Sequence, residues 1–474
     1  MALQEKLGID ERINEAFQPI SNFWEGLILH EFFGTGIPTI IFLLVGGAAF
    51  FTLYFGFINI RGFGLSLRTV MGRYDGLDEK RKGSGEVSHF QALATAVSGT
   101  VGNGNIAGVA MAIAIGGPGA TFWMILCGLL GMSSKFVECT LGVKYRDVGE
   151  DGTVYGGPMY YLSKGLKERG FEKFGKVLAV IFAILCIGAS FGGGNAAQSN
   201  QAALQMVDLF GLTGGSARTI VGVIMMIVVG IIIIGGIKRI ASVTEKIVPF
   251  MAGMYVLACL YIIFSNLSFV DDAFAMIING AFAPTAAVGG FIGVLIQGFR
   301  RGAFSNEAGI GMAPMAHGAA KTNNPIKEGF VAMLAPAVDT LVVCTMTAMA
   351  ILVTDVWKTD ANGVSLTASA FESSFPVFGN YILLVCVLIF SISSLFSYSY
   401  YGTKCLSFLM GDENKKKYNY IYIISIMVGA TTSLSMMINL IDTFFALMAI
   451  PTMIATLLLA PKVVAKLKEY EIKK

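Results

Sequence analysis

The chain has 474 residues, of which 55% are hydrophobic and only 14% are charged, and its formal net charge at pH 7 is +3. Ordinary soluble domains carry about 25% charged residues, so this composition excludes an ordinary soluble protein, and the small net charge gives no sign of a nucleic-acid partner. The apolar residues come in blocks of about 20, long enough to cross a hydrocarbon core of about 30 Å. The sequence therefore predicts an all-α polytopic protein of the lipid bilayer.

The charged, amphipathic segment 1–34 precedes the first apolar block and lacks the pattern of a cleavable signal peptide. About eleven spans are predicted after it, at residues 38–58, 89–114, 119–143, 176–205, 217–236, 243–264, 286–316, 328–353, 379–410, 419–438 and 441–460. The seven cysteines are scattered and form no Cys/His cluster, which indicates neither a disulfide framework nor a metal site. No cofactor is expected.

Lys and Arg residues gather in every second connection between spans. The basic connections include 61–82, 144–173, 238–246, 321–327, 415–417 and the tail 462–474. Because positively charged connections stay in the cytoplasm, the pattern predicts an N-terminus outside the cell and a C-terminus in the cytoplasm.

Two spans are interrupted by seams rich in glycine and polar residues, Gly99–Gly108 and Gly302–Gly311. Glycine disfavours helix by up to about 1 kcal/mol per position, so both seams predict an unwound backbone. Unwound backbone at membrane depth is tolerated where it lines a cavity, and its bare N–H and C=O groups can bind cargo and ions. Close helix packing through small residues is the alternative, but it does not explain Asn103, Asn105 and Glu307 beside the glycines.

Each interrupted span is the first of a set of five, and because five is odd the second set must lie inverted relative to the first. Paired interruptions in two inverted halves point to a transport site near the bilayer midplane. The predicted division is an extracytoplasmic segment 1–34, a peripheral first span 35–60, a basic cytoplasmic linker 61–85, a first five-helix repeat 86–264, an inverted second repeat 286–461 and a basic cytoplasmic tail 462–474.

Several longer motifs resemble the alanine or glycine:cation symporter family, also called sodium:alanine symporters. They are Gly99–Ala110, Gly116–Met124, Gly156–Tyr161, Phe304–Gly311, Ala313–His317 and Tyr400–Gly402. The resemblance implies a leucine-transporter-like five-plus-five fold preceded by one extra helix, in a bacterial or archaeal cell membrane. It also implies sodium-coupled uptake of a small neutral amino acid, with Na⁺ as the coupling ion and no enzymatic activity.

The same resemblance implies which groups hold the ion. The carbonyls of Ser98 and Val101 would face Na⁺ together with the hydroxyls of Ser393 and Ser394, in keeping with the preference of this hard cation for oxygen ligands. Close packing of a serine-rich helix is the alternative explanation for the serines. A second ion site would use Thr100 and Asn105.

The cargo site follows from the same register. The carboxylate would bind the backbone N–H groups of Asn103, Gly104 and Asn105, and the ammonium would face carbonyls at 302–305. The remaining expected contacts are Gln198, Phe304 and Tyr398. The resemblance implies alanine or glycine as the cargo. Family members usually carry Thr in place of Asn103 and Trp in place of Tyr398, and these two departures favour a larger or more polar cargo such as glutamine as the alternative.

Ionisable residues are costly to place inside a membrane span, so those that occur there are interpreted as functional. Glu307 and Asp339 are the candidates, and Glu307 would serve in a proton-coupled transporter, the alternative to sodium coupling. Arg300 and Arg301 are expected to pair with Glu307, Asp339 or Glu138, and His317 is expected to be a cap or surface residue. A sensor or channel that binds amino acids without concentrating them is a further alternative.

Overall fold

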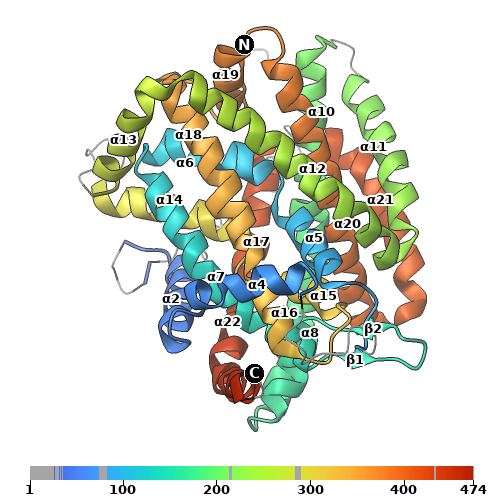
Figure 1. Ribbon diagram of the computed structural model, residues 1–474. Coiled ribbons are helices and arrows are strands. Elements are labelled where there is room, and N and C mark those ends of the chain that lie inside the picture. The colour runs from blue at the N-terminus through green and yellow to red at the C-terminus, as the bar shows by residue number, and fades with distance from the viewer. Residues whose placement is uncertain are drawn as a thin grey trace, which may run out of the picture.

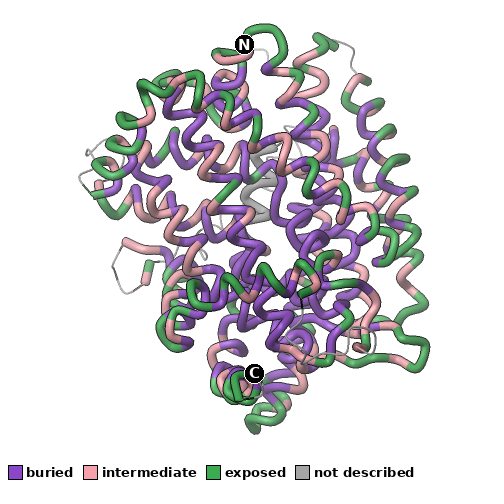
Figure 2. Tube along the Cα trace, in the orientation of Figure 1, coloured by how far each residue is buried: buried purple, intermediate pink, exposed green. Residues whose placement is uncertain are grey.

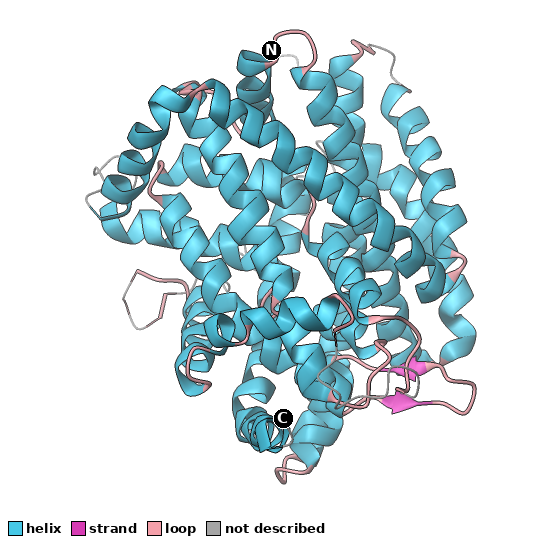
Figure 3. Cartoon of the chain, viewed as in Figure 1, coloured by secondary structure: helices cyan, strands magenta, loops and turns pink. Residues whose placement is uncertain are grey.

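The computed structural model describes residue 26, residues 31, 32 and 34, and the segments 36–73, 83–212, 216–282, 290–431 and 434–472, with the helix but not the side chains of 434–441. Most of the predicted segment 1–34 and residues 74–82 of the basic linker lie outside this description. Within it the chain is almost entirely helical, and the sheet is one antiparallel pair, β1 (Asp147–Val148) and β2 (Val154–Tyr155) (Figures 1 and 3).

Helices occupy the predicted spans (Figure 1). In chain order they are α2 (Thr39–Tyr54); α5 (His89–Thr100), η1 (Gly104–Gly108) and α6 (Val109–Gly116); α7 (Ala120–Lys144); α9 (Glu172–Phe191), η3 (Gly192–Ala196) and α10 (Ala197–Leu209); α11 (Ala217–Ile233); α12 (Gly236–Ser265); α14 (Gly290–Asn306) and α15 (Ala313–Gly318); α16 (Pro325–Ala332), α17 (Leu334–Pro336), η6 (Ala337–Cys344) and α18 (Thr345–Val353); α20 (Gly379–Met410); α21 (Lys415–Thr431); and α22 (Leu434–Ile472). The predicted boundary between spans 419–438 and 441–460 is wrong, since α22 already begins at Leu434.

Shorter helices connect or flank these. They are α3 (Ile58–Arg61), α4 (Phe63–Val70), α8 (Pro158–Tyr160), η2 (Tyr161–Gly165), η4 (Leu267–Phe269), α13 (Val270–Phe282), η7 (Val356–Lys358), α19 (Val364–Ser374) and η8 (Asp412–Asn414). The hairpin β1–β2, α8 and α16 lie at one end of the molecule, and α13 and α19 lie at the other (Figure 1).

Among the described residues, six helices or helix runs are long and apolar enough to cross a membrane by length and composition. They are Ala120–Lys144, Glu172–Leu209, Gly236–Ser265, Pro325–Val353, Gly379–Met410 and Asp442–Ile472. Exposed positions lie along the outside of the helices (Figure 2). The outer face of α12 is apolar, because Phe250, Leu257 and Phe264 recur at every seventh residue and each is more than half exposed. Such a stripe is unfavourable in water and is the expected surface toward lipid.

The first predicted interruption is present between α5 and η1. A capping box at Ser88 starts α5, and the helix ends where Val101 turns to an extended conformation. The N–H of Gly102 then bonds to the side-chain oxygen of Asn105, at 2.9 Å, instead of to a backbone carbonyl. A side chain thus replaces the helical hydrogen bond that the glycine-rich sequence does not sustain.

The second interruption separates α14 from α15. Glu307 adopts a left-handed conformation with φ of 53°, and Gly309 and Gly311 also have positive φ, at 88° and 97°. Glycine takes this conformation without penalty, whereas a glutamate does so only when its surroundings hold it there. The side chain of Asn306 accepts the N–H of Ala308 at 3.0 Å, which replaces another lost helical bond.

The two broken helices run antiparallel to each other. At one end the N–H of Val87, just before α5, donates to the carbonyl of Ala319, just after α15, at 3.1 Å. At the other end Gly116 of α6 packs against the side chain of Gln297 of α14. Near the middle, Asn105 donates to the hydroxyl of Ser305 at 3.2 Å, so the breaks meet. This arrangement is the one expected of two inverted sets.

Two further irregularities were not predicted. The π-helical turns η3 and η6 interrupt spans that the sequence predicts as continuous helices. In η3, a Cβ on Gly194 would lie 2.0 Å from the ring of Tyr398, so only glycine allows this approach. π-Turns are often found at functional sites, and both turns face the breaks described above.

Candidate functional site

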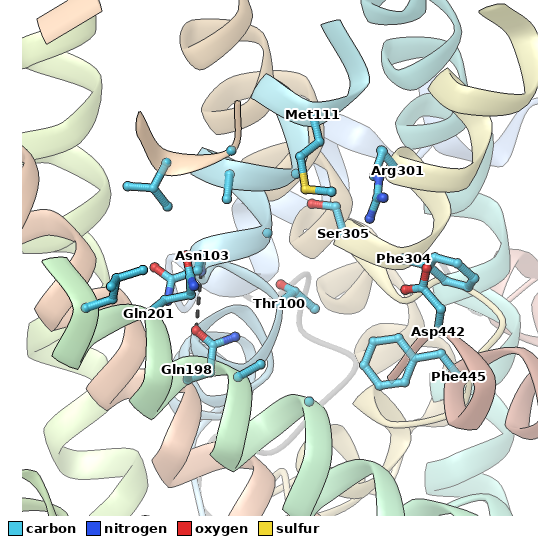
Figure 4. Close-up of a pocket in the computed structure, with 18 of the residues that line it drawn as sticks. Thr100, Asn103, Met111, Gln198, Gln201, Arg301, Phe304, Ser305, Asp442 and Phe445 are labelled. Carbon is cyan, nitrogen blue, oxygen red and sulfur yellow. Dashed lines mark hydrogen bonds between the residues drawn. The ribbon is translucent and has the colours of Figure 1, made fainter. Parts of the chain in front are cut away.

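A cavity of about 280 Å³ lies where the two breaks meet (Figure 4). Of the predicted cargo residues, Asn103, Gly104, Gln198, Phe304 and Tyr398 line it, and Asn105 does not. The remaining lining includes Thr100, Met111, Gln201, Gln205, Asp208, Arg301, Ser305, Glu307, Asn362, Asp442 and Phe445. The cavity therefore extends from the breaks toward the end of the molecule where α10 ends and α19 begins (Figure 1).

The first break presents backbone donors to this cavity. Gly104 is exposed, and a Cβ placed on it would meet no atom within 4 Å. It begins η1 and α6, a run of 13 residues whose N-terminal end carries a partial positive charge. Asn103 donates from its side chain to Ser391 at 2.9 Å, and its buried amide oxygen has no hydrogen-bond partner in the described part of the chain. The positive end of the helix suits a carboxylate, whereas the free amide oxygen of Asn103 is an acceptor and suits a donor such as an ammonium.

Gln198 faces the same donors from α10. Its side-chain oxygen accepts the N–H of Asn103 at 3.4 Å, a long contact that a bound acceptor could replace (Figure 4). Gln201 lies one turn along the same helix and also lines the cavity. This wall is therefore made of amides, while the opposite wall carries the aromatic rings of Phe304 and Phe445 (Figure 4).

Asn105 is turned away from the cavity. Its side-chain nitrogen donates to a carboxylate oxygen of Asp339 at 2.5 Å, and its backbone N–H is already bonded to the carbonyl of Gly102 at 3.1 Å. Asp339 also accepts from the hydroxyl of Ser305 at 3.0 Å. Asn105 and Asp339 thus tie the first break to η6 and the second break, and neither lines the cavity.

Only some of the predicted ion ligands contact one another. The hydroxyl of Ser394 donates to the carbonyl of Ser98 at 3.0 Å, which joins α20 to the end of α5. The hydroxyl of Ser393 points elsewhere, to the carbonyl of Phe390 at 2.9 Å and the sulfur of Met251 at 3.5 Å. No hydrogen bond between these serines and Val101 is found among the described residues. Ser98 also contacts Ser393, because its hydroxyl donates to the backbone carbonyl of Ser393 at 3.3 Å.

Another serine in this group was not predicted. The hydroxyl of Ser397 lies 2.5 Å from that of Ser98 and donates to the carbonyl of Thr95 at 2.6 Å. Its spacing was readable in the sequence, since Ser394 and Ser397 are three residues apart and share one face of a helix.

Glu307 lines the cavity from the second break. Its carboxylate accepts a short hydrogen bond from the hydroxyl of Tyr398, and both side chains are buried. Its backbone carbonyl accepts a hydrogen bond from Lys135 of α7 at 3.0 Å. The left-handed glutamate is therefore fixed from both the side chain and the backbone.

The expected pairing of the two arginines with Glu307, Asp339 or Glu138 is wrong for Arg300. It pairs instead with Asp442 of α22, at 2.7 Å, an acid that sequence reasoning missed although a charge inside a span is a readable signal. Arg301 lines the cavity, and its buried Nε has no hydrogen-bond partner in the described segments.

The expectation that His317 lies on the surface is also wrong, because the residue is fully buried, in the last turn of α15. Its Nδ1 lies 2.6 Å from one oxygen of Glu328, and His89 hydrogen-bonds the other oxygen. The three side chains join the start of α5, the end of α15 and the start of α16. Arg146 adds hydrogen bonds to the carbonyls of Ala320, Ser84 and Thr322 at 2.6–2.7 Å, so this end of the broken helices is closed.

The chain is similar to known transporters over nearly its whole length. The model of the sodium:alanine symporter family matches residues 27–474. The sodium/alanine symporter AgcS of Methanococcus maripaludis is 40% identical over 92% of this chain and 95% of that protein. The probable sodium/glutamine symporter GlnT of Bacillus subtilis is 36% identical over 91% of this chain and 87% of that protein.

Among solved structures, MhsT in complex with L-phenylalanine aligns with a TM-score of 0.49 and 13% identity, over 78% of this chain and 89% of that one. The family model and the relatives confirm the family that the sequence motifs predict. This chain is thus a membrane transporter, and it belongs to the sodium:alanine symporter family.

Proposed function

We propose that the protein is a sodium-coupled symporter that takes up a small neutral amino acid by alternating access. The observation that carries the proposal is the cavity of about 280 Å³ lined by both helix breaks, with Gly104 from the first and Glu307 from the second. Unwound backbone at membrane depth offers donors and acceptors that a zwitterion can satisfy and lipid cannot.

The carboxylate of the cargo binds at the N–H of Gly104, with the N–H of Asn103 available once Gln198 shifts. The positive end of the helix that follows adds to the attraction. The ammonium faces the second break, where the carboxylate of Glu307 is the acceptor. The carbonyls at 302–305, which the sequence suggested as acceptors, lie inside the helix α14, and that of Ala303 already accepts the N–H of Glu307 at 3.1 Å. Phe304 and Tyr398 bound the side-chain space.

Na⁺ binds between the first break and α20. The carbonyl of Ser98 and the hydroxyl of Ser394 are already 3.0 Å apart, and the ion would enter between them with the carbonyl of Val101. Ser393 joins the ligand set only if its hydroxyl leaves Met251. Asn105 positions the first break rather than contacting the cargo.

Alanine, glycine and glutamine are the candidate cargoes. The names of the relatives AgcS and GlnT include alanine and glutamine, and the amides Gln198, Gln201 and Asn103 around the cavity suit an ω-amide as well as a carboxylate. The protein works in the cell membrane with the closed end, at His89 and His317, toward the cytoplasm. The cavity then opens to the outside.

Thermal-shift screening of the purified protein against all twenty amino acids, in sodium and in choline, tests this function. We expect stabilisation by one or more small neutral amino acids in sodium, with a much smaller shift in choline. Stabilisation of equal size in choline would contradict the proposed sodium site. If a change of pH replaced sodium, coupling would instead run through protons at Glu307.

A further inference from the structure

A buried ion pair on α7 lies directly behind the second break. Lys135 and Glu138 are one turn apart, with Nζ and Oε1 separated by 3.4 Å, and neither side chain has any exposed surface. Burying two charges is costly, and an ion pair alone does not generally repay the loss of hydration. The pair therefore calls for an explanation beyond mutual attraction.

The two charges face complementary parts of the broken backbone. Lys135 donates to the carbonyl of Glu307 at 3.0 Å, just past the C-terminal end of the 17-residue helix α14. The carboxylate of Glu138 lies beside the N–H groups of Gly309 and Gly311, and its oxygens form no standard hydrogen bond in the described part of the chain. No hydrogen bond from these two N–H groups is found among the described residues.

The sign of each charge is opposite to the partial charge of the backbone group that it faces. Carbonyls at the end of a helix carry a partial negative charge and favour a cation, and bare N–H groups favour an anion. Glu307 also has a left-handed backbone, which persists only where several contacts hold it. Lys135 holds its carbonyl and Tyr398 holds its side chain.

We propose that Lys135 and Glu138 are a positioning pair that keeps the second break in its cargo-binding shape. Neither residue lines the cavity, so both act through Glu307 and the glycines after it. The pair is oriented, with the cation toward the carbonyl and the anion toward the N–H groups. The proposal rests on the proposed function, because cargo binding is what the shape serves.

The orientation can be tested by exchanging the charges. The double variant Lys135→Glu/Glu138→Lys keeps an ion pair at the same spacing but places a carboxylate against the carbonyl of Glu307. We expect its dissociation constant for the cargo in sodium to rise at least about tenfold, since small displacements of positioning groups have effects of this size. The probes are alanine, glycine and glutamine, and the measurement is equilibrium binding of radiolabelled amino acid to the purified full chain.

A matched control is available on α22. Lys466 and Glu469 form an ion pair of the same order and spacing at 2.7 Å, but about half exposed and in the C-terminal part of that helix. Exchanging their charges should leave cargo affinity unchanged. Lys135→Arg, which keeps a cationic donor, should restore most of the affinity that Lys135→Met loses, whereas a role in packing alone would favour Met.

The possible outcomes distinguish failure of this proposal from failure of the proposed function. If the exchanged variant binds cargo within about threefold of the wild type, the pair has no orientation-dependent role and the proposal is wrong. If the exchanged variant does not purify as a monodisperse protein, equal affinities of Lys135→Arg and Lys135→Met would overturn the proposal in the same way. If the wild type itself binds no amino acid in sodium, the proposed function fails and the proposal fails with it.

Discussion

Gly104 and Ser394 are the two residues on which the proposed chemistry depends most directly. Gly104 lines the cavity and has open space at the position of a Cβ, and Ser394 brings a hydroxyl to a carbonyl at the end of α5. Both are small, and each can be changed by one or two atoms without disturbing the packing around it. They therefore separate binding from folding.

Gly104→Ala should weaken cargo binding without destabilising the protein. The methyl group meets no protein atom, and alanine favours a helical backbone over glycine by about 0.5–1 kcal/mol, so stability should stay equal or rise slightly. The same methyl group would occupy the space of the carboxylate, and we expect the cargo dissociation constant to rise at least about tenfold.

Gly253→Ala on α12 is the matched control, because a Cβ there also meets no atom within 4 Å but the residue is not in the cavity wall. Thermal melting and equilibrium cargo binding of both variants give the comparison. Unaltered binding by Gly104→Ala would mean that the carboxylate does not bind at the first break.

Ser394→Ala should raise the sodium concentration needed for half-maximal cargo binding by roughly tenfold, the effect of losing an interaction with a charge worth about 1.5 kcal/mol. Ser393→Ala should change it by less than about twofold, because that hydroxyl points to Met251. Titrations of sodium at fixed cargo check this. A larger effect of Ser393→Ala than of Ser394→Ala would mean that Na⁺ binds on the face of α20 that carries Ser393.

At the scale of elements, the two broken helices form one unit that crosses the protein. They meet at their breaks through Asn105 and Ser305, and at one end they are joined through the buried side chains of His89, His317 and Glu328. To open the cavity toward the other side of the membrane, the two broken helices have to separate at this closed end. The two histidines and the glutamate between them should therefore stabilise the closed state described here.

Glu328→Gln tests this closure. The substitution keeps the volume but removes the charge that two imidazoles share, and we expect a loss of about 1–3 kcal/mol, seen as a lower melting temperature. Glu372→Gln on the exposed face of α19 is the control and should have no effect. A melting temperature of Glu328→Gln equal to that of the control would show that the cluster does not hold this end together.

The breaks themselves were predictable from the sequence, and much of the surrounding structure was not. Glycine density and side chains such as Asn105 encode unwinding locally, so the seams Gly99–Gly108 and Gly302–Gly311 could be found without tertiary contacts. The π-turn at Gly192–Ala196 contains Gly194, on which Tyr398 packs, and the partner of Arg300 is 142 residues away. Those features depend on contacts between distant segments, which composition and spacing do not reveal.

At the scale of the whole molecule, the predicted orientation gives each end a different environment. The hairpin β1–β2 and the C-terminal part of α22 lie at one end, and the residues around Asp360 lie near the other, beside the mouth of the cavity (Figure 1). The cavity opens outward only if the basic connections are cytoplasmic.

Cysteine labelling in intact cells tests the orientation, since all seven native cysteines are buried. Asp360→Cys and Glu150→Cys each place a thiol at an exposed position. A membrane-impermeant maleimide should label the first variant in intact cells and the second only after the membrane is opened. The reverse labelling pattern would mean that the protein has the opposite orientation in the membrane.

Accumulation of amino acid in proteoliposomes tests the central claim, that a sodium gradient drives cargo through the cavity between the two breaks. With sodium outside and choline inside, radiolabelled alanine, glycine or glutamine should rise above its equilibrium level inside the vesicles and return to it when the sodium gradient is dissipated. Uptake that stops at equilibrium, or accumulation of the same size driven by a pH gradient without sodium, would contradict the account.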